Sequence, residues 1–219
     1  MAALRFLTSF VLLILATHSH ACRCIWEGNF TQLDLTGKTI VLGTVTQHSG
    51  NSMDLAVSDV LQGKLFQEQI RIWGAIGNLC RADVKEFEDG SQWLMVLESI
   101  EEIPDWGFNP STPNYSFGRK GDYTLSRCGV YWLKHHNGYL SGNVDDSRRW
   151  LYLDKKKSPV SLKLIKAFID GRADKTLLAE AAKPPEDKQE LLTDTRVFLR
   201  QQIREELLEE KLESLQETE

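Results

Sequence analysis

Short runs of β-forming residues, separated by turn residues, divide the first two thirds of the chain into expected strands. Residues 39–45 are rich in β-formers, and residues 53–58 alternate large apolar with small or polar side chains after a Ser-Gly-Asn-Ser turn. Residues 69–73 resume this pattern. Residues 92–97 form a continuous apolar run of strand length, which predicts a central strand buried on both faces.

Further strand signals follow a long irregular connection. Residues 103–121 contain three prolines and three glycines, and compact domains rarely carry such a loop without a function, so we interpret it as part of a binding surface. Residues 123–128 alternate again, and residues 131–133 lead into Asn137-Gly138, a strong signal for a tight hairpin turn before a strand at residues 139–140. This pattern fits a barrel and a sandwich equally well.

The periodicity becomes helical toward the C-terminus. Ser158-Pro159 predicts a helix start, Gly171 a helix end, and one apolar face is formed by Val160, Leu164, Ile165, Phe168 and Ile169, which we expect to pack on the sheet. Residues 176–182 have room for two helical turns. Beyond Pro184-Pro185, residues 186–219 predict an amphipathic helical tail that lies against its own domain or self-associates as a short coiled coil.

Charge is distributed unevenly, and this excludes some classes of partner. The chain carries a formal charge of −5. Residues 22–185 contain 20 basic and 20 acidic residues, whereas residues 186–219 contain 5 basic and 11 acidic residues. A neutral domain with an acidic tail has no electrostatic footprint for nucleic acid, so we expect no nucleic-acid partner.

Motifs of enzyme chemistry are absent from the sequence. It contains no His-Glu-x-x-His, no nucleophile elbow, no phosphate-cradling glycine loop and no dinucleotide fingerprint. The acidic pair Asp145-Asp146 is interpreted as solvated charge in a loop. We therefore expect a protein that is not an enzyme and has neither a cofactor nor a metal of its own.

The N-terminus has the features of a cleavable signal peptide. Arg5 precedes an apolar stretch at residues 10–16 and a small-residue exit ending at Ala21, and the stretch is too short to span a membrane. Cleavage after Ala21 would leave residues 22–219 as a secreted, extracellular protein, or a periplasmic one in a bacterium, with a free amine on Cys22. A lipoprotein acylated at Cys22 is the alternative, but Ser19 and His20 depart from the residues usual before such a cysteine.

Four cysteines, at positions 22, 24, 80 and 128, form an even set in an exported chain. This favours two disulfides. A Cys22–Cys24 bond would close a very small, strained ring, which leaves two pairings open.

The leading Cys22-Arg23-Cys24 and the two distant cysteines resemble the inhibitory domain of the tissue inhibitors of metalloproteinases, within the netrin-like group. The resemblance covers about residues 22–145. It implies a mainly β fold, a five-stranded closed barrel of the oligonucleotide/oligosaccharide-binding type, followed by a packing helix and connection at residues 146–185 and the acidic tail. It also implies the pairs Cys22–Cys80 and Cys24–Cys128.

The resemblance further implies an inhibitor of zinc metalloproteinases. The amine and carbonyl of Cys22 would chelate the catalytic zinc of the enzyme, and the Arg23 side chain would enter its specificity pocket. The family usually carries a small residue at the second position, and its third disulfide is missing here. Both departures favour the alternative, a non-inhibitory secreted netrin-like module that binds another extracellular protein or a glycan.

Two asparagines, Asn29 and Asn114, match the N-glycosylation acceptor pattern. The pattern is common by chance and has meaning only in a source that glycosylates its secreted proteins.

Overall fold

A computed structural model describes residues 23–105, 107, 115–154, 157 and 159–183. The expected signal peptide at residues 1–21, Cys22, Asn114 and the acidic tail at residues 186–219 lie outside these residues. No helix in the described part of the chain is long and apolar enough to cross a membrane.

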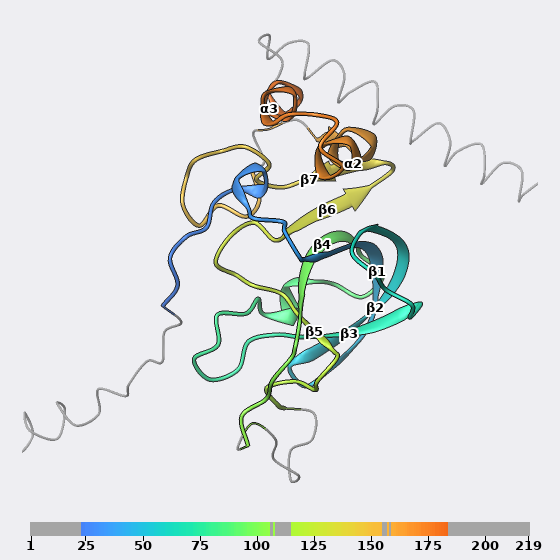
Figure 1. The fold of residues 1–219 in the computed structure, drawn as a ribbon, viewed down its shortest axis with the longest axis vertical. Helices are drawn as coiled ribbons and strands as arrows, with labels where there is room; N and C mark the ends of the chain where they lie inside the picture. The colour runs from blue at the N-terminus through green and yellow to red at the C-terminus, as the bar shows by residue number, and fades with distance from the viewer. Residues whose placement is uncertain (1–22, 106, 108–114, 155–156, 158, 184–219) are drawn as a thin grey trace, which may run out of the picture.

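Five strands close into a barrel, which confirms the expected mainly β fold. They are β1 (Thr39–Ser49), β2 (Ser52–Gln62), β3 (Gln69–Trp73), β4 (Gln92–Ser99) and β5 (Tyr123–Thr124). Around the barrel the order is β1-β2-β3-β5-β4, and β4 pairs back to β1 from Thr39↔Leu97 to Thr44↔Gln92. The β3–β5 pair is parallel and the other four are antiparallel (Figure 1). Because β4 pairs with β1, the five strands form a closed barrel and not a sandwich of two sheets.

Strand β4 is central, as its apolar run predicts. It pairs with β1 on one side, and with β5 and β6 (Trp132–His136) on the other, and Leu94 to Leu97 are all fully buried. A strand paired on both edges and covered on both faces must be apolar throughout. The core around it is formed by Phe30, Ile40, Leu55, Ile72, Phe87, Leu125 and Leu133, each at most 1% exposed.

Three further strands extend the sheet beyond the barrel. β6 forms a hairpin with β7 (Tyr139–Ser141), and β7 pairs with β8 (Val160–Ser161). The hairpin turns at Asn137 and Gly138, whose φ angles are 48° and 81°. This is the tight turn that the Asn-Gly pair predicts.

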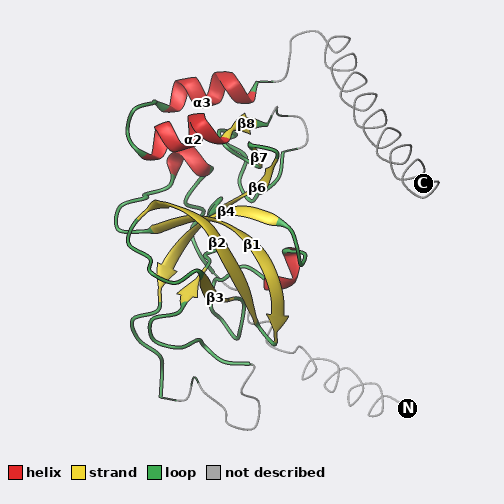
Figure 2. Ribbon diagram, turned by 90° about the vertical axis from the view of Figure 1, so that its right-hand side faces the viewer, coloured by secondary structure: helices red, strands yellow, loops and turns green. Residues whose placement is uncertain are grey.

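Two short helices, α2 (Leu162–Ile169) and α3 (Lys175–Ala182), lie together at one end of the molecule (Figure 2). Ile165 and Leu178 are fully buried and join the barrel core, as expected of packing helices. Gly171 ends α2 with a φ of 71° and donates its N–H to the Phe168 carbonyl, as predicted.

The predicted start of the first of these helices is wrong. Val160 and Ser161 pair with β7, and the helix begins at Leu162 with Ser161 as its cap, since its hydroxyl accepts the Leu164 N–H at 3.3 Å. Val160 is a β-branched residue buried beside Leu140, and it therefore pairs with the edge of β7 instead of joining the helix.

Candidate functional site

The candidate site is the N-terminal segment and the cysteines that fasten it to the barrel. Residues 23–27 form neither helix nor strand, and Gly28 makes a parallel bridge to Gly129. The Glu27 N–H donates to the Cys128 carbonyl at 2.7 Å, and the Val130 N–H donates to the Gly28 carbonyl at 3.0 Å. The segment is thus hydrogen-bonded to residues 128–130 through both a donor and an acceptor.

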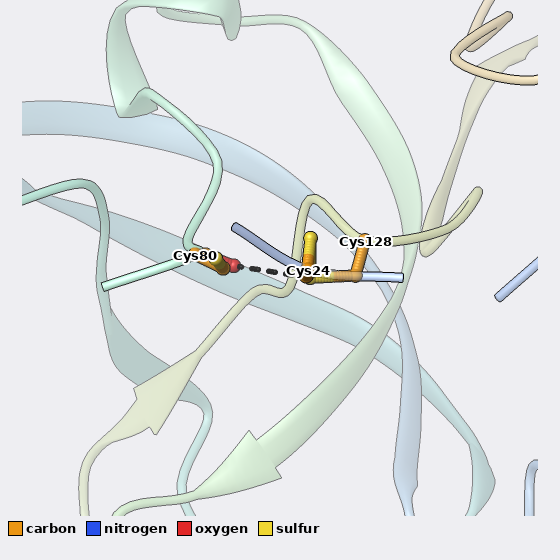
Figure 3. A group of neighbouring side chains, drawn as sticks. All are labelled: Cys24, Cys80 and Cys128. Carbon is orange, nitrogen blue, oxygen red and sulfur yellow. Dashed lines mark hydrogen bonds between the residues drawn. A yellow bond between two sulfur atoms is a disulfide. The ribbon is translucent and has the colours of Figure 1, made fainter. Parts of the chain in front are cut away.

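A disulfide joins Cys24 to Cys128, with Cα atoms 5.7 Å apart, which confirms the predicted pair. Cys80 is also half of a disulfide, and its predicted partner, Cys22, lies outside the described residues, so that pair stays a prediction. The sulfur atoms of Cys24, Cys80 and Cys128 lie within 4.8 Å of one another (Figure 3). Disulfide formation consumes these thiols, so the cluster is a covalent anchor and not a metal site.

The segment that carries Cys80 is itself held firmly. The Cys80 carbonyl accepts the Arg127 N–H at 3.1 Å, and the Ala82 N–H donates to the Leu125 carbonyl at 2.8 Å. The Arg81 guanidinium is partly buried and donates to the Phe117 carbonyl at 2.7 Å. Burial lowers the pKa of Arg81, and the charge of Glu98 partly offsets this. A group bonded to Cys80 would therefore be attached to rigid backbone.

Arg23 and Ile25, by contrast, point into solvent. The Arg23 side chain is exposed, and Ile25 is 89% exposed although it is a large aliphatic residue. Cys24 between them is half-buried and covalently fixed. The side chains on either side of a fixed disulfide are thus free to enter a partner.

A row of aromatic rings runs from exposed Trp150 through this segment to the buried Trp132. Trp26 lies between Trp150 and Tyr152, with ring centroids 5.2 and 5.6 Å away. Tyr152 stacks on Trp132 at 4.7 Å with the planes 7° apart. Trp150 is half exposed and has a φ of 61°, a conformation that a bulky residue adopts only when its surroundings impose it.

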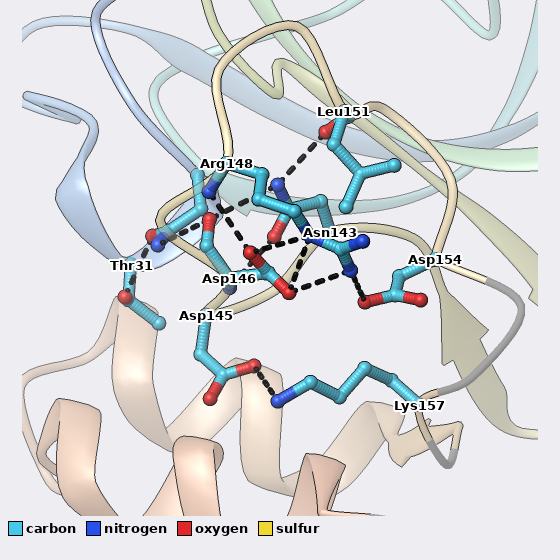
Figure 4. A network of polar contacts seen from close by, with 9 residues as sticks. Thr31, Asn143, Asp145, Asp146, Arg148, Leu151, Asp154 and Lys157 are labelled. Atoms are coloured by element: carbon cyan, nitrogen blue, oxygen red, sulfur yellow. Dashed lines mark hydrogen bonds and ion pairs between the residues drawn. The ribbon is translucent and has the colours of Figure 1, made fainter.

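A polar network in residues 143–154 imposes this conformation (Figure 4). Asn143 is fully buried, its Nδ2 donates to the carbonyls of Leu151 and Asp146 at 2.8 and 3.1 Å, and its Oδ1 accepts the Asp146 N–H at 2.8 Å. Arg148 bridges the carboxylates of Asp146 and Asp154 at 2.8 and 2.9 Å. The loop is therefore cross-linked on both sides of Trp150.

The same network ties the loop to the N-terminal region. Nδ2 of Asn29, which is 2% exposed, donates to the Asp146 carbonyl at 3.2 Å, and the Thr31 N–H donates to the Val144 carbonyl at 3.0 Å. A glycan on Asn29 would displace the first of these contacts. Asn114, the other acceptor match, lies outside the described residues.

The acidic pair Asp145-Asp146 is not solvated charge, contrary to expectation. Their side chains are 14% and 17% exposed, Asp145 pairs with Lys157 at 3.3 Å, and Asp146 pairs with Arg148. The hydrogen bonds from Arg148 lower the pKa of Asp146 from 3.8 to about 2. No periodic pattern in the sequence predicts such a loop. The aromatic row could not be predicted either, because its rings come from three segments that are distant in sequence.

Acid should loosen this loop only at very low pH. A carboxyl whose pKa is lowered by folding contributes stability that is complete above its unfolded value and is lost as the pH falls through its folded value. NMR titration of the Asp146 carboxyl should therefore give a midpoint near pH 2. Arg148→Met should move the midpoint toward 3.8, whereas Arg149→Met, which removes the neighbouring exposed arginine, should leave it in place. A wild-type midpoint near 3.8 would contradict the bridge.

The fold and site define a closed five-stranded β-barrel with a disulfide-anchored N-terminal segment. Comparisons with protein-family models, with curated proteins and with solved structures gave no match. A fold alone does not specify a function, so the argument for function rests on the site.

Proposed function

We propose that the mature chain is a secreted inhibitor of zinc metalloproteinases that begins at Cys22. In this mechanism the α-amine and carbonyl of Cys22 bind the catalytic zinc of the enzyme, which keeps an open coordination position. The side chain of Arg23 enters the specificity pocket beside the zinc. The protein contributes a chelating terminus and no metal of its own.

One observation carries the proposal: an exposed residue, Arg23, precedes a cysteine that is covalently fixed to the barrel. The sulfur of Cys80 lies beside that disulfide, and its backbone is hydrogen-bonded to Arg127. A Cys22–Cys80 bond would fix the terminus on the other side of Arg23. Such a terminus loses little conformational entropy when it binds, because its backbone is ordered beforehand.

The nature of Arg23 sets the kind of enzyme that the inhibitor would fit. A guanidinium buried in an apolar pocket loses its hydration and gains no partner, which costs several kcal/mol. A pocket that contains a carboxylate would offset this cost with a charge-assisted hydrogen bond. The proposed target is therefore a zinc metalloproteinase with an acidic specificity pocket.

Replacing Arg23 should switch the preference for enzymes. Arg23→Thr removes a charged hydrogen bond worth about 1.5–3 kcal/mol, so inhibition of an enzyme with an acidic pocket should weaken by roughly 10- to 100-fold. Inhibition of enzymes with apolar pockets should strengthen. Arg172→Thr, an exposed arginine beyond α2, is the control and should change neither inhibition constant. Equal inhibition by wild type and Arg23→Thr would show that Arg23 does not enter the pocket.

The proposal is tested first by mass spectrometry of the secreted, non-reduced protein. We expect a free amine on Cys22 and a peptide that links Cys22 to Cys80. An acylated or extended terminus would contradict the zinc mechanism. The alternative function, a secreted module that binds a protein or a glycan without inhibiting a proteinase, would then remain. The unusual Arg23 favours this alternative.

A further inference from the structure

A second candidate site lies on the sheet extension, away from the cysteines. A cavity of about 150 Å³ opens between strands β4, β6 and β7, the segment of residues 86–91, and Tyr152-Leu153. The floor of the cavity is formed by three residues that are paired across the strands: Trp93 on β4 is opposite Lys134 on β6, and Lys134 is opposite Ser141 on β7. Three neighbouring strands therefore each contribute one side chain to the same surface.

The walls of this cavity are rigid aromatic rings. Phe87 is fully buried and packs edge-on against Trp93 at 5.0 Å and against Trp132 at 5.5 Å. Tyr152 stacks on Trp132. The Trp93 Nε1–H donates to the Ser91 hydroxyl at 2.6 Å, so the orientation of this partly exposed ring is fixed.

Polar groups stand at the rim without ion-pair partners. Within the described residues, Glu86, Glu88 and Lys134 form no salt bridge, and the ammonium of Lys134 lies 5.8 Å from the Trp93 ring centre. The cavity thus combines two carboxylates, one ammonium and the Ser141 hydroxyl above aromatic rings. An enclosed apolar surface with a few converging polar groups is the usual form of a small-ligand site.

The charges exclude most ligand classes. An anion such as a phosphate or a sulfated sugar would face two carboxylates. A cation would be repelled by the ammonium of Lys134, which lies over the Trp93 ring. A neutral ligand with one apolar face and several hydroxyl groups meets neither obstacle.

We propose that this cavity binds one ring of a neutral saccharide. The rings with exposed surface in this cavity are Trp93 and Tyr152, and the C–H face of a pyranose packs on such a ring. Adjacent hydroxyl groups donate to a carboxylate in charge-assisted hydrogen bonds. Glu86 and Glu88 accept from the sugar hydroxyls, and Lys134 and Ser141 donate to its oxygens. A volume of about 150 Å³ has room for about one sugar ring. The site does not depend on Cys22 or on proteinase inhibition.

The test is saturation-transfer NMR on the full-length secreted protein, with neutral hexoses and N-acetylhexosamines as probes. Glucuronic acid and tetramethylammonium serve as the anionic and cationic comparisons. We expect saturable binding of at least one neutral sugar with a dissociation constant in the millimolar range, because a single sugar ring buries little surface. Glu86→Gln and Glu88→Gln should each weaken it, and the double variant should weaken it at least tenfold. Glu68→Gln, the same change on an exposed glutamate before β3, is the control and should bind as the wild type does.

Each outcome decides the proposal. Loss of binding in the Glu86/Glu88 variants with retention in Glu68→Gln supports the site. No saturable binding of any neutral sugar, equal binding in all variants, or preferential binding of the anionic or cationic probe overturns it. The proteinase assay is independent of these results, so failure of one proposal leaves the other standing.

Discussion

One alanine added before Cys22 is expected to abolish proteinase inhibition. The extension converts the α-amine of Cys22 into an amide, which does not bind zinc as an amine does, and it places an extra residue where the metal should be. Loss of one strong metal ligand costs several kcal/mol, so the inhibition constant should rise by about a thousandfold or more. The measurement is a titration of the most strongly inhibited zinc metalloproteinase with both proteins.

The control for this extension must keep the terminus intact. An alanine added after the last residue, Glu219, lengthens the chain equally and should leave inhibition unchanged. Both extended proteins should unfold at the same temperature as the wild type, since neither addition touches the barrel core. Full inhibition by the N-terminally extended protein would show that the contact with the enzyme does not use the Cys22 amine.

Removal of the Cys24–Cys128 disulfide should have the largest effect on stability. The bond joins residues 104 positions apart, for which chain entropy predicts about 4.7 kcal/mol of stabilisation. We expect Cys24→Ser with Cys128→Ser to lower the free energy of unfolding by about this amount in a urea titration. Inhibition should weaken as well, because residues 23–26 then lose their covalent attachment and must be ordered on binding.

A matched change on the same segment separates these two effects. Ile25→Ser removes an exposed side chain beside the disulfide and should alter the free energy of unfolding by no more than about 0.5 kcal/mol. A Cys24/Cys128 variant as stable as the wild type would show that the loop entropy model fails here. A destabilised variant with full inhibition would show that the anchor is irrelevant to binding.

Much of the barrel follows from local pattern in the sequence. Residues 92–97 predict a strand buried on both faces because every position after Gln92 is apolar, and β4, with Leu94 to Leu97 fully buried, is that strand. Asn137-Gly138 predicts the hairpin because both positions require positive φ. The strand order, however, depends on contacts distant in sequence, and it was the family resemblance that selected a barrel over a sandwich.

Only part of the candidate site could be predicted from the sequence. Cys24–Cys128 was implied by the resemblance and is present. The row from Trp150 through Trp26 and Tyr152 to Trp132 has no local signal, because rings distant in sequence meet only after folding. Solvated charge was the expectation for Asp145-Asp146 because acidic residues in a loop are usually exposed. Instead Asp145 pairs with Lys157, and Arg148 bridges Asp146 and Asp154.

The measurement that tests the central proposal most directly is inhibition of a broad panel of zinc metalloproteinases by the mature protein, with its free Cys22 amine verified beforehand. We predict one-to-one inhibition of at least one enzyme at about 1 µM or below, and loss of binding when a small chelator already occupies the catalytic zinc. Serine, cysteine and aspartic proteinases should be unaffected. Absence of inhibition across the panel at that concentration, or binding that the chelator does not displace, would contradict the zinc mechanism.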